Sequence, residues 1–126
     1  MSASDYLENA ILNHILGSSA LSQPSKFLAL STASLQDDNS GTELSGNGYA
    51  RKAITFGTAS SGSITNSGAV EFDTATGSQG TISHFGIYDA STSGNLLFHG
   101  AFSASKVIST GDVLKVSASA LTISLD

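Results

Sequence analysis

The sequence contains no cysteine and no tryptophan, and it has one proline among its 126 residues. Without cysteine, neither a disulfide framework nor a thiolate metal site can form. No apolar run approaches the roughly 20 residues that a membrane-spanning helix requires. These absences exclude a disulfide-stapled module and a helical membrane protein, so no membrane partner is expected.

Charged residues are also scarce, at 12% of the sequence against the roughly 25% that is typical of soluble domains. The chain has five basic and ten acidic residues, which leaves a net charge of −5. A nucleic-acid partner is not expected, because such proteins need a clustered basic footprint to neutralise phosphates. Arg51 and Lys52 form the one basic pair, and we interpret both as solvated strand positions.

The surface must therefore be covered mainly by serine, threonine, asparagine and glycine. Such a neutral coat suits packing against other copies, because few charged side chains have to be desolvated. We expect a homo-oligomer, with a trimer as its symmetry. The start of the chain, MSASDYLENA, lacks the basic residues and apolar middle of a signal peptide, which favours an origin in the cytoplasm.

The segment from Gly80 to Phe102 predicts a β-hairpin, because two apolar runs flank a loop of small polar residues. With Tyr88 opposite Leu97 or Asn95, the two faces of the hairpin separate by polarity. One face would hold Phe85, Ile87, Leu96, Phe98 and Phe102, and we expect its phenylalanines and Ile87 in the core. The other would hold His84, Gly86, Tyr88, Leu97, His99 and Ala101.

Residues 5–16, DYLENAILNHIL, carry the one helical pattern. Asp5 is the expected N-cap, Glu8 follows three residues later, and Gly17 stands where a left-handed C-terminal stop belongs. The apolar stripe runs along Leu7, Ile11 and Ile15. Because so short a helix is marginal alone in water, the stripe must pack either on its own sandwich or on a neighbouring subunit.

The rest of the chain predicts short strands separated by turn residues. The expected strands are 26–33, 49–56, 69–73, the central hairpin, 113–118 and 121–125, with turns or loops over 34–48 and 57–68. In the second strand Ala50, Ile54 and Phe56 would point inward, and in the third Val70 and Phe72 would share a face. This pattern predicts a mainly β protein, a single β-sandwich, jelly-roll-like or immunoglobulin-like, with one N-terminal α-helix. We divide it into a helix and linker, 1–24, and a sandwich domain, 25–126.

Two groups of residues raise the question of a metal. The loop from Asp37 to Glu43 resembles a calcium loop in composition, but counting back from Gly41 puts Gln36 where the first acid belongs. We therefore favour a solvated loop over a calcium site. His84 and His99 would be cross-strand or diagonal neighbours, yet the sequence supplies no third ligand, so we place them in a subunit contact or on a polar face. No metal and no cofactor are expected.

Catalytic signatures are equally weak. The sequence has no G-x-S-x-G elbow, no phosphate-binding loop and no complete dinucleotide fingerprint, and Gly46 and Gly48 of GNGYAR are better interpreted as turn residues. Only the folded structure could bring a serine, a histidine and an aspartate together as a catalytic set, because no sequence motif joins them. We therefore assign no catalytic residues and expect a protein that is not an enzyme.

Five segments together resemble the small virion proteins of tailed bacteriophages that are described as tail or tail-fibre proteins. The segments are DYLENAILNHILG, FLALSTA, GYARKAITFG, ISHFGIYDASTSGNLLFHGAF and GDVLKVSASALTISLD. The resemblance implies a structural virion subunit, in a tail, a tail fibre or a capsid decoration, that is assembled in the host cytoplasm with other virion proteins. It carries no catalytic chemistry.

Two functions from different classes follow. The first is assembly into the virion, with Leu7, Ile11, Ile15, His84 and His99 as the expected interface. The second is a carbohydrate- or receptor-binding module on the virion surface. Sugar sites usually offer stacking aromatic rings, and Tyr6, Tyr49 and Tyr88 are the few tyrosines available. The sequence therefore favours assembly.

Overall fold

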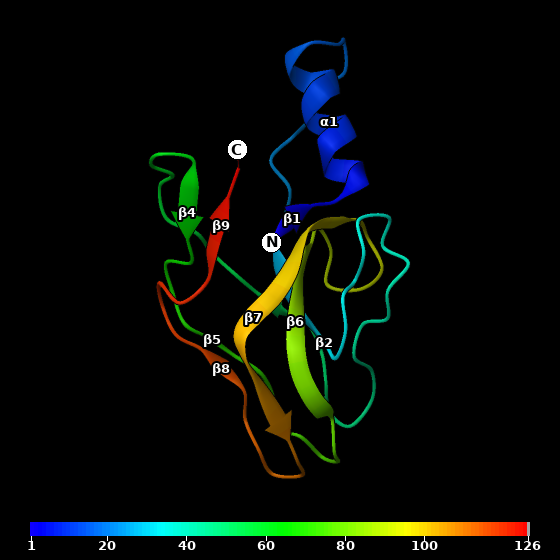
Figure 1. The fold of residues 1–126 in the computed structure, drawn as a ribbon, viewed down its shortest axis with the longest axis vertical. Helices are drawn as coiled ribbons and strands as arrows, with labels where there is room; N and C mark the ends of the chain where they lie inside the picture. The colour runs from blue at the N-terminus through cyan, green and yellow to red at the C-terminus, as the bar shows by residue number, and fades with distance from the viewer. Residues whose placement is uncertain (126) are drawn as a thin grey trace.

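A long antiparallel hairpin organises the fold (Figure 1). In the computed structural model, which describes residues 1–125, β6 (Gly80–Tyr88) pairs with β7 (Leu96–Ile108). On the other side of β6 lie β2 (Phe27–Ser31) and then β3 (Lys52–Ala53), and β1 (Ser2–Ala3) pairs with β7. The resulting five-stranded sheet has the order β1-β7-β6-β2-β3.

Two short ladders form a second layer beside this sheet (Figure 1). One joins β4 (Ser63–Thr65) to β9 (Thr122–Ser124), and the other joins β5 (Val70–Glu71) to β8 (Lys115–Val116). The arrangement is mainly β with one N-terminal helix, and its two layers are sandwich-like. This confirms the predicted fold class.

The main core lies between the two layers, and a smaller cluster covers the opposite face of the large sheet. Both layers contribute to the main core, which includes Leu28, Leu30, Phe85 and Ile87 from the large sheet and Val70, Phe72, Val116 and Ile123 from the ladders and their flanks. The smaller cluster contains Ala29, Leu35, Tyr88 and Leu96. The large sheet is therefore apolar on both faces.

The register of the hairpin confirms most of the predicted faces and corrects one pair. Ile87 lies opposite Phe98 and Gly86 opposite His99, as polarity requires. Between Ile87 and Tyr88, however, the register shifts, so that Tyr88 pairs with Leu96. Leu97 then joins the main core and Leu96 the smaller cluster, which reverses the two predicted positions. A bulge of this kind changes the alternation of side chains between faces.

The remaining strands are present but shorter than predicted. Val70 and Phe72 are both buried in the main core, as expected. Within 49–56 only Lys52 and Ala53 form a strand, and Ala50 is exposed, so the prediction that Ala50 points inward is wrong. The predicted turn region 57–68 contains β4. The ladder of β4 is three residues long, too short to show alternation.

The helix α1 (Asp5–Ile15) is present, but its predicted caps are wrong. Ser4 is the N-cap: its hydroxyl accepts a hydrogen bond from the backbone N–H of Leu7, and Asp5 lies in the first turn. Ser4 is buried and its backbone N–H donates to the Leu97 carbonyl, which ties the start of the helix to β7. At the other end Leu16 is the C-cap, and Gly17 does not adopt a positive φ.

Candidate functional site

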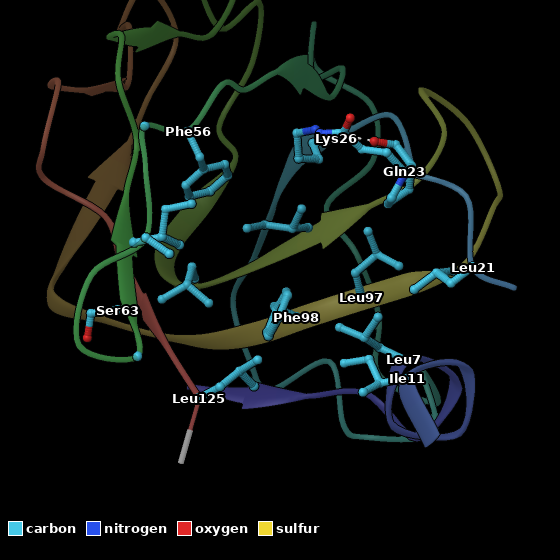
Figure 2. A pocket seen from close by; sticks show the side chains of 17 residues that line it. Leu7, Ile11, Leu21, Gln23, Lys26, Phe56, Ser63, Leu97, Phe98 and Leu125 are labelled. Carbon is cyan, nitrogen blue, oxygen red and sulfur yellow. Dashed lines mark hydrogen bonds between the residues drawn. The ribbon is translucent and has the colours of Figure 1, made fainter. Parts of the chain in front are cut away.

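An apolar groove lies between α1 and the β4–β9 ladder (Figure 2). Its volume is about 460 Å³. The side chains of Ile87, Leu97 and Phe98 line it from the large sheet, and Phe56 projects into it from the segment before β4 (Figure 2). The groove is therefore an open continuation of the main core at the end of the molecule that carries the helix.

The two walls of the groove come from distant parts of the chain. Leu7 and Ile11, which are four residues apart and hence on one helix face, form the first wall. Ile64 and Ile123 form the second, where they are directly opposite each other in the β4–β9 ladder. Lys26, the residue before β2, is the one charged residue in the lining.

Beyond the groove, α1 ends in an uncovered apolar surface. Leu12, Ile15 and Leu16 are 56%, 68% and 79% exposed, and we call these three residues the helix tip. The helix projects from one end of the sheets, away from the strands (Figure 1). Side chains of this kind are usually buried, so three of them in one exposed turn mark a surface that suits a partner.

The five residues predicted for the interface lie in two places. Leu7 and Ile11 line the groove, and Ile15 belongs to the helix tip. His84 and His99 are on the opposite face of the large sheet, as their register with Ala101 and Gly86 shows. The structure thus brings three of the five predicted residues to one end of the molecule.

His99 is held inside the protein by an acidic partner. It is 9% exposed, and its Nε2 atom lies 2.6 Å from the Oδ1 atom of Asp37. Hydrogen bonds from His99 and from the Ser2 hydroxyl hold the pKa of Asp37 below its usual value. Since the backbone N–H of Asp5 donates to the Asp37 carbonyl, this contact fastens the acidic loop to β1, β7 and the helix.

Arg51 is the centre of a buried polar network, so its interpretation as a solvated strand position is wrong. Its side chain is 7% exposed and makes a two-pronged ion pair with Glu43, with Nη2–Oε1 and Nε–Oε2 distances of 2.8 and 2.9 Å. Its Nη1 group donates to the carbonyls of Ala90 and Ser93. The guanidinium lies 3.7 Å from the centre of the Tyr88 ring. One arginine thereby connects the loop 34–48 to the loop between β6 and β7 and to the last residue of β6.

The two tyrosines of this network are also held in one protonation state. The Tyr49 hydroxyl donates to Glu43 and accepts from the backbone N–H of Leu30 at 3.1 Å. Burial and the neighbouring Glu43 carboxylate raise the pKa of Tyr49 far above its usual value. Burial, followed by the Glu43 charge, likewise raises the pKa of Tyr88. Both rings are thus kept neutral well into the alkaline range.

We expect the protein to lose stability as the pH rises above about 10, where free tyrosine ionises. There the unfolded chain releases the protons of Tyr49 and Tyr88 while the folded chain retains them, so the stability present below pH 10 declines. Urea unfolding between pH 8 and 11.5 measures this. Tyr49→Phe should be less stable at pH 8 but lose less stability on going to pH 11.5. An equal pH dependence in both proteins would contradict the assignment.

The carboxylates of the acidic loop 37–43 make contacts within the protein. Asp37 binds His99, Asp38 accepts from the backbone N–H of Ser40, and Glu43 pairs with Arg51. Within residues 1–125, no group of three or more histidine, aspartate or glutamate side chains is placed to hold a metal ion. Within the same residues, no helix is long and apolar enough to cross a membrane.

Sequence reasoning missed half of the groove. The stripe of Leu7, Ile11 and Ile15 was visible as a helical period and Phe56 was predicted to point inward, but no pattern indicated that Ile64, in a predicted turn region, pairs with Ile123. Leu21 and Pro24 also line the groove. They are the larger apolar residues of a linker rich in serine, and they are the one local signal for this part of the groove.

The comparisons with known proteins agree with this picture of a structural subunit. The family model described as "Podophage GP4 fiber I protein gp80" matches residues 2–124, which is nearly the whole chain. No curated protein matches the chain. The match confirms the resemblance to tailed-phage virion proteins and specifies a fibre. The chain belongs to the podophage fiber I protein family.

Proposed function

We propose that this protein is a non-enzymatic structural subunit of a phage tail fibre that acts as a homo-oligomer, a trimer, in contact with other virion proteins. Membership of a fibre family supports the tail over a head decoration. In this proposal the subunit is assembled in the host cytoplasm. Residues 1–24 act as the assembly segment and residues 25–126 as the sandwich body.

One observation carries the proposal: the helix tip and the groove leave a large apolar surface uncovered at one end of the molecule. A monomer in water would expose that surface permanently, whereas an oligomer would bury it. The contact predicted for His84 and His99 stays a prediction. Because the His99 ring is buried against Asp37, such a contact would mainly involve His84.

A role in sugar recognition has less support. Tyr88 is 3% exposed and is stacked under Arg51, and the Tyr49 hydroxyl is used inside the same network. Among the three tyrosines, Tyr6 alone has an exposed ring. A single ring gives a weak platform for a sugar, so assembly remains the better account.

The double variant Ile15→Ser/Leu16→Ser should convert the oligomer to a monomer. It removes two exposed apolar side chains from the helix tip and leaves Leu7, the buried residue of α1, in place. We therefore expect monomer mass in light scattering and a circular dichroism spectrum close to wild type, with a lower melting temperature because the stabilisation from subunit association is lost. Deleting 1–17 is a poorer test, because it also removes β1 and the Ser4 contacts with β7.

Val107→Ser is the matched control, since Val107 is 61% exposed and lies at the far end of β7. It should leave the oligomer intact. A wild-type protein that stays monomeric at high concentration would overturn the proposal. So would a tip variant that keeps the mass of the wild-type oligomer.

A further inference from the structure

We propose that the helix tip of one copy occupies the groove of the next copy, in a head-to-tail contact. This inference rests on the homo-oligomer proposed above and specifies its interface. The tip supplies three exposed aliphatic side chains, and the groove supplies an open apolar recess beside the same helix. Each copy therefore carries both halves of the contact.

A copy cannot fill its own groove with its own tip. The helix turns by about 100° per residue, so Leu16 and Leu12 lie about 180° and 140° around the helix from Leu7. Ile15 lies about 80° from Leu7, but it is 68% exposed and does not line the groove. Since Leu7 faces the groove, the tip leucines point to other sides of the helix. Because none of the three tip side chains lines the groove of its own molecule, in this proposal the groove is filled by the tip of another copy.

Charge favours the same pairing. The C-terminal end of a helix carries a partial negative charge from its carbonyl groups. The acidic side chains of α1, Asp5 and Glu8, lie in its first turn, away from the tip, and His14 in the last turn accepts a hydrogen bond from the backbone N–H of Leu21 through its Nδ1 atom. Lys26 is the charged residue of the groove, so an incoming helix end brings its negative pole toward a positive side chain.

The geometry also decides the kind of symmetry. Because the tip and the groove are different patches, the contact is heterologous, and it closes into a ring if the rotation between copies permits. A two-fold dimer would instead place one patch against itself, tip against tip. The proposed contact is therefore consistent with a closed trimer and inconsistent with a tip-to-tip dimer.

Engineered cysteines test the contact directly, because the natural chain has none. Leu16→Cys places a thiol on the tip, and Ala59→Cys places one on the wall of the groove opposite α1. We expect a disulfide-linked dimer when the two single variants are mixed and mildly oxidised. Each variant alone should remain uncrosslinked, and the double variant should give a covalent ring of the size measured by light scattering.

The pair Leu16→Cys and Ser105→Cys is the control for random collision, since Ser105 is exposed on β7 at the other end of the molecule. It should crosslink at least tenfold less. Oligomers that show no excess of the 16–59 crosslink, or that crosslink through Leu16→Cys alone, would overturn the head-to-tail contact and leave the proposed function standing. A wild-type monomer in light scattering would overturn both.

Discussion

Phe85→Ala should lower the free energy of unfolding by about 3 to 5 kcal/mol, the usual cost of removing a buried aromatic ring. Phe85 is 2% exposed and lies in the main core, opposite Leu30 on β2 and Gly100 on β7. Its ring centre is 5.3 Å from that of Phe102. Because Phe85 is almost fully enclosed, removing its ring leaves a cavity that the surrounding side chains fill only in part. Urea unfolding followed by circular dichroism measures the loss.

Phe98→Ala is the informative comparison, because Phe98 lies on the same hairpin face but borders the open groove. Phe98→Ala should therefore lower the free energy of unfolding by less than Phe85→Ala does. The sequence predicts His99 on an outer face, where His99→Ala would be nearly neutral. In the structure His99 is buried against Asp37, so this substitution should lower the free energy of unfolding measurably. Val107→Ala, at an exposed site, should change stability by under about 0.5 kcal/mol. Equal costs for Phe85 and Phe98 would contradict the difference in burial.

The hairpin shows which part of the fold a sequence can predict. Phe85 and Ile87 alternate with His84 and Gly86, so burial selects one face for each, and the structure agrees. At Leu96 and Leu97 two identical side chains follow one another. Either could face the main core, and only the bulge at Tyr88 decides, so no pattern in the sequence could assign them.

The helix and its groove also differ in how far the sequence predicts them. The apolar period of α1 is a local property, and it correctly predicts that Leu7 is buried, although Ile15 on the same stripe is exposed. The groove also needs the wall formed by Ile64 and Ile123, which are 59 residues apart and meet in a ladder of three pairs. Such long-range pairing leaves no periodic signal in segments this short. Ile15 was predicted on the same stripe as Leu7 and Ile11, and only the structure separates it from the groove.

Arg51 illustrates a different limit. An arginine beside a lysine in a strand is usually solvated, and nothing in YARK indicates that Glu43, eight residues earlier, turns back to meet it. The pair forms because the loop 34–48 folds over the sheet and places Glu43 beside Tyr49 and Arg51. Ion pairs between loops depend on tertiary placement, which hydropathy does not encode.

Arg51→Ala should destabilise the protein by about 3 kcal/mol, near the lower end of what the loss of one partner from a buried ion pair costs. The change leaves Glu43, which is 22% exposed, without its cation, and it removes the ring contact with Tyr88. Arg51→Lys should recover only part of the loss, because an ammonium group cannot make the two-pronged pair or stack in the same way. Lys52→Ala is the neighbouring control. Its pair with Asp73 is largely exposed, so its loss should cost under about 1 kcal/mol.

The double variant Glu43→Leu/Arg51→Met tests whether the cost of Arg51→Ala comes from the unpaired carboxylate rather than from lost packing. Replacing both charges with apolar side chains of similar size removes the stranded charge, and such replacements are often neutral or stabilising. We expect the double variant to be clearly more stable than Arg51→Ala, although Tyr49 loses its acceptor on Glu43. A double-mutant cycle of urea unfolding, with Glu43→Leu and Arg51→Met as the singles, gives the coupling between the two positions. Strictly additive losses would show that Arg51 stabilises the fold through the carbonyls of Ala90 and Ser93 and the ring of Tyr88, and not through Glu43.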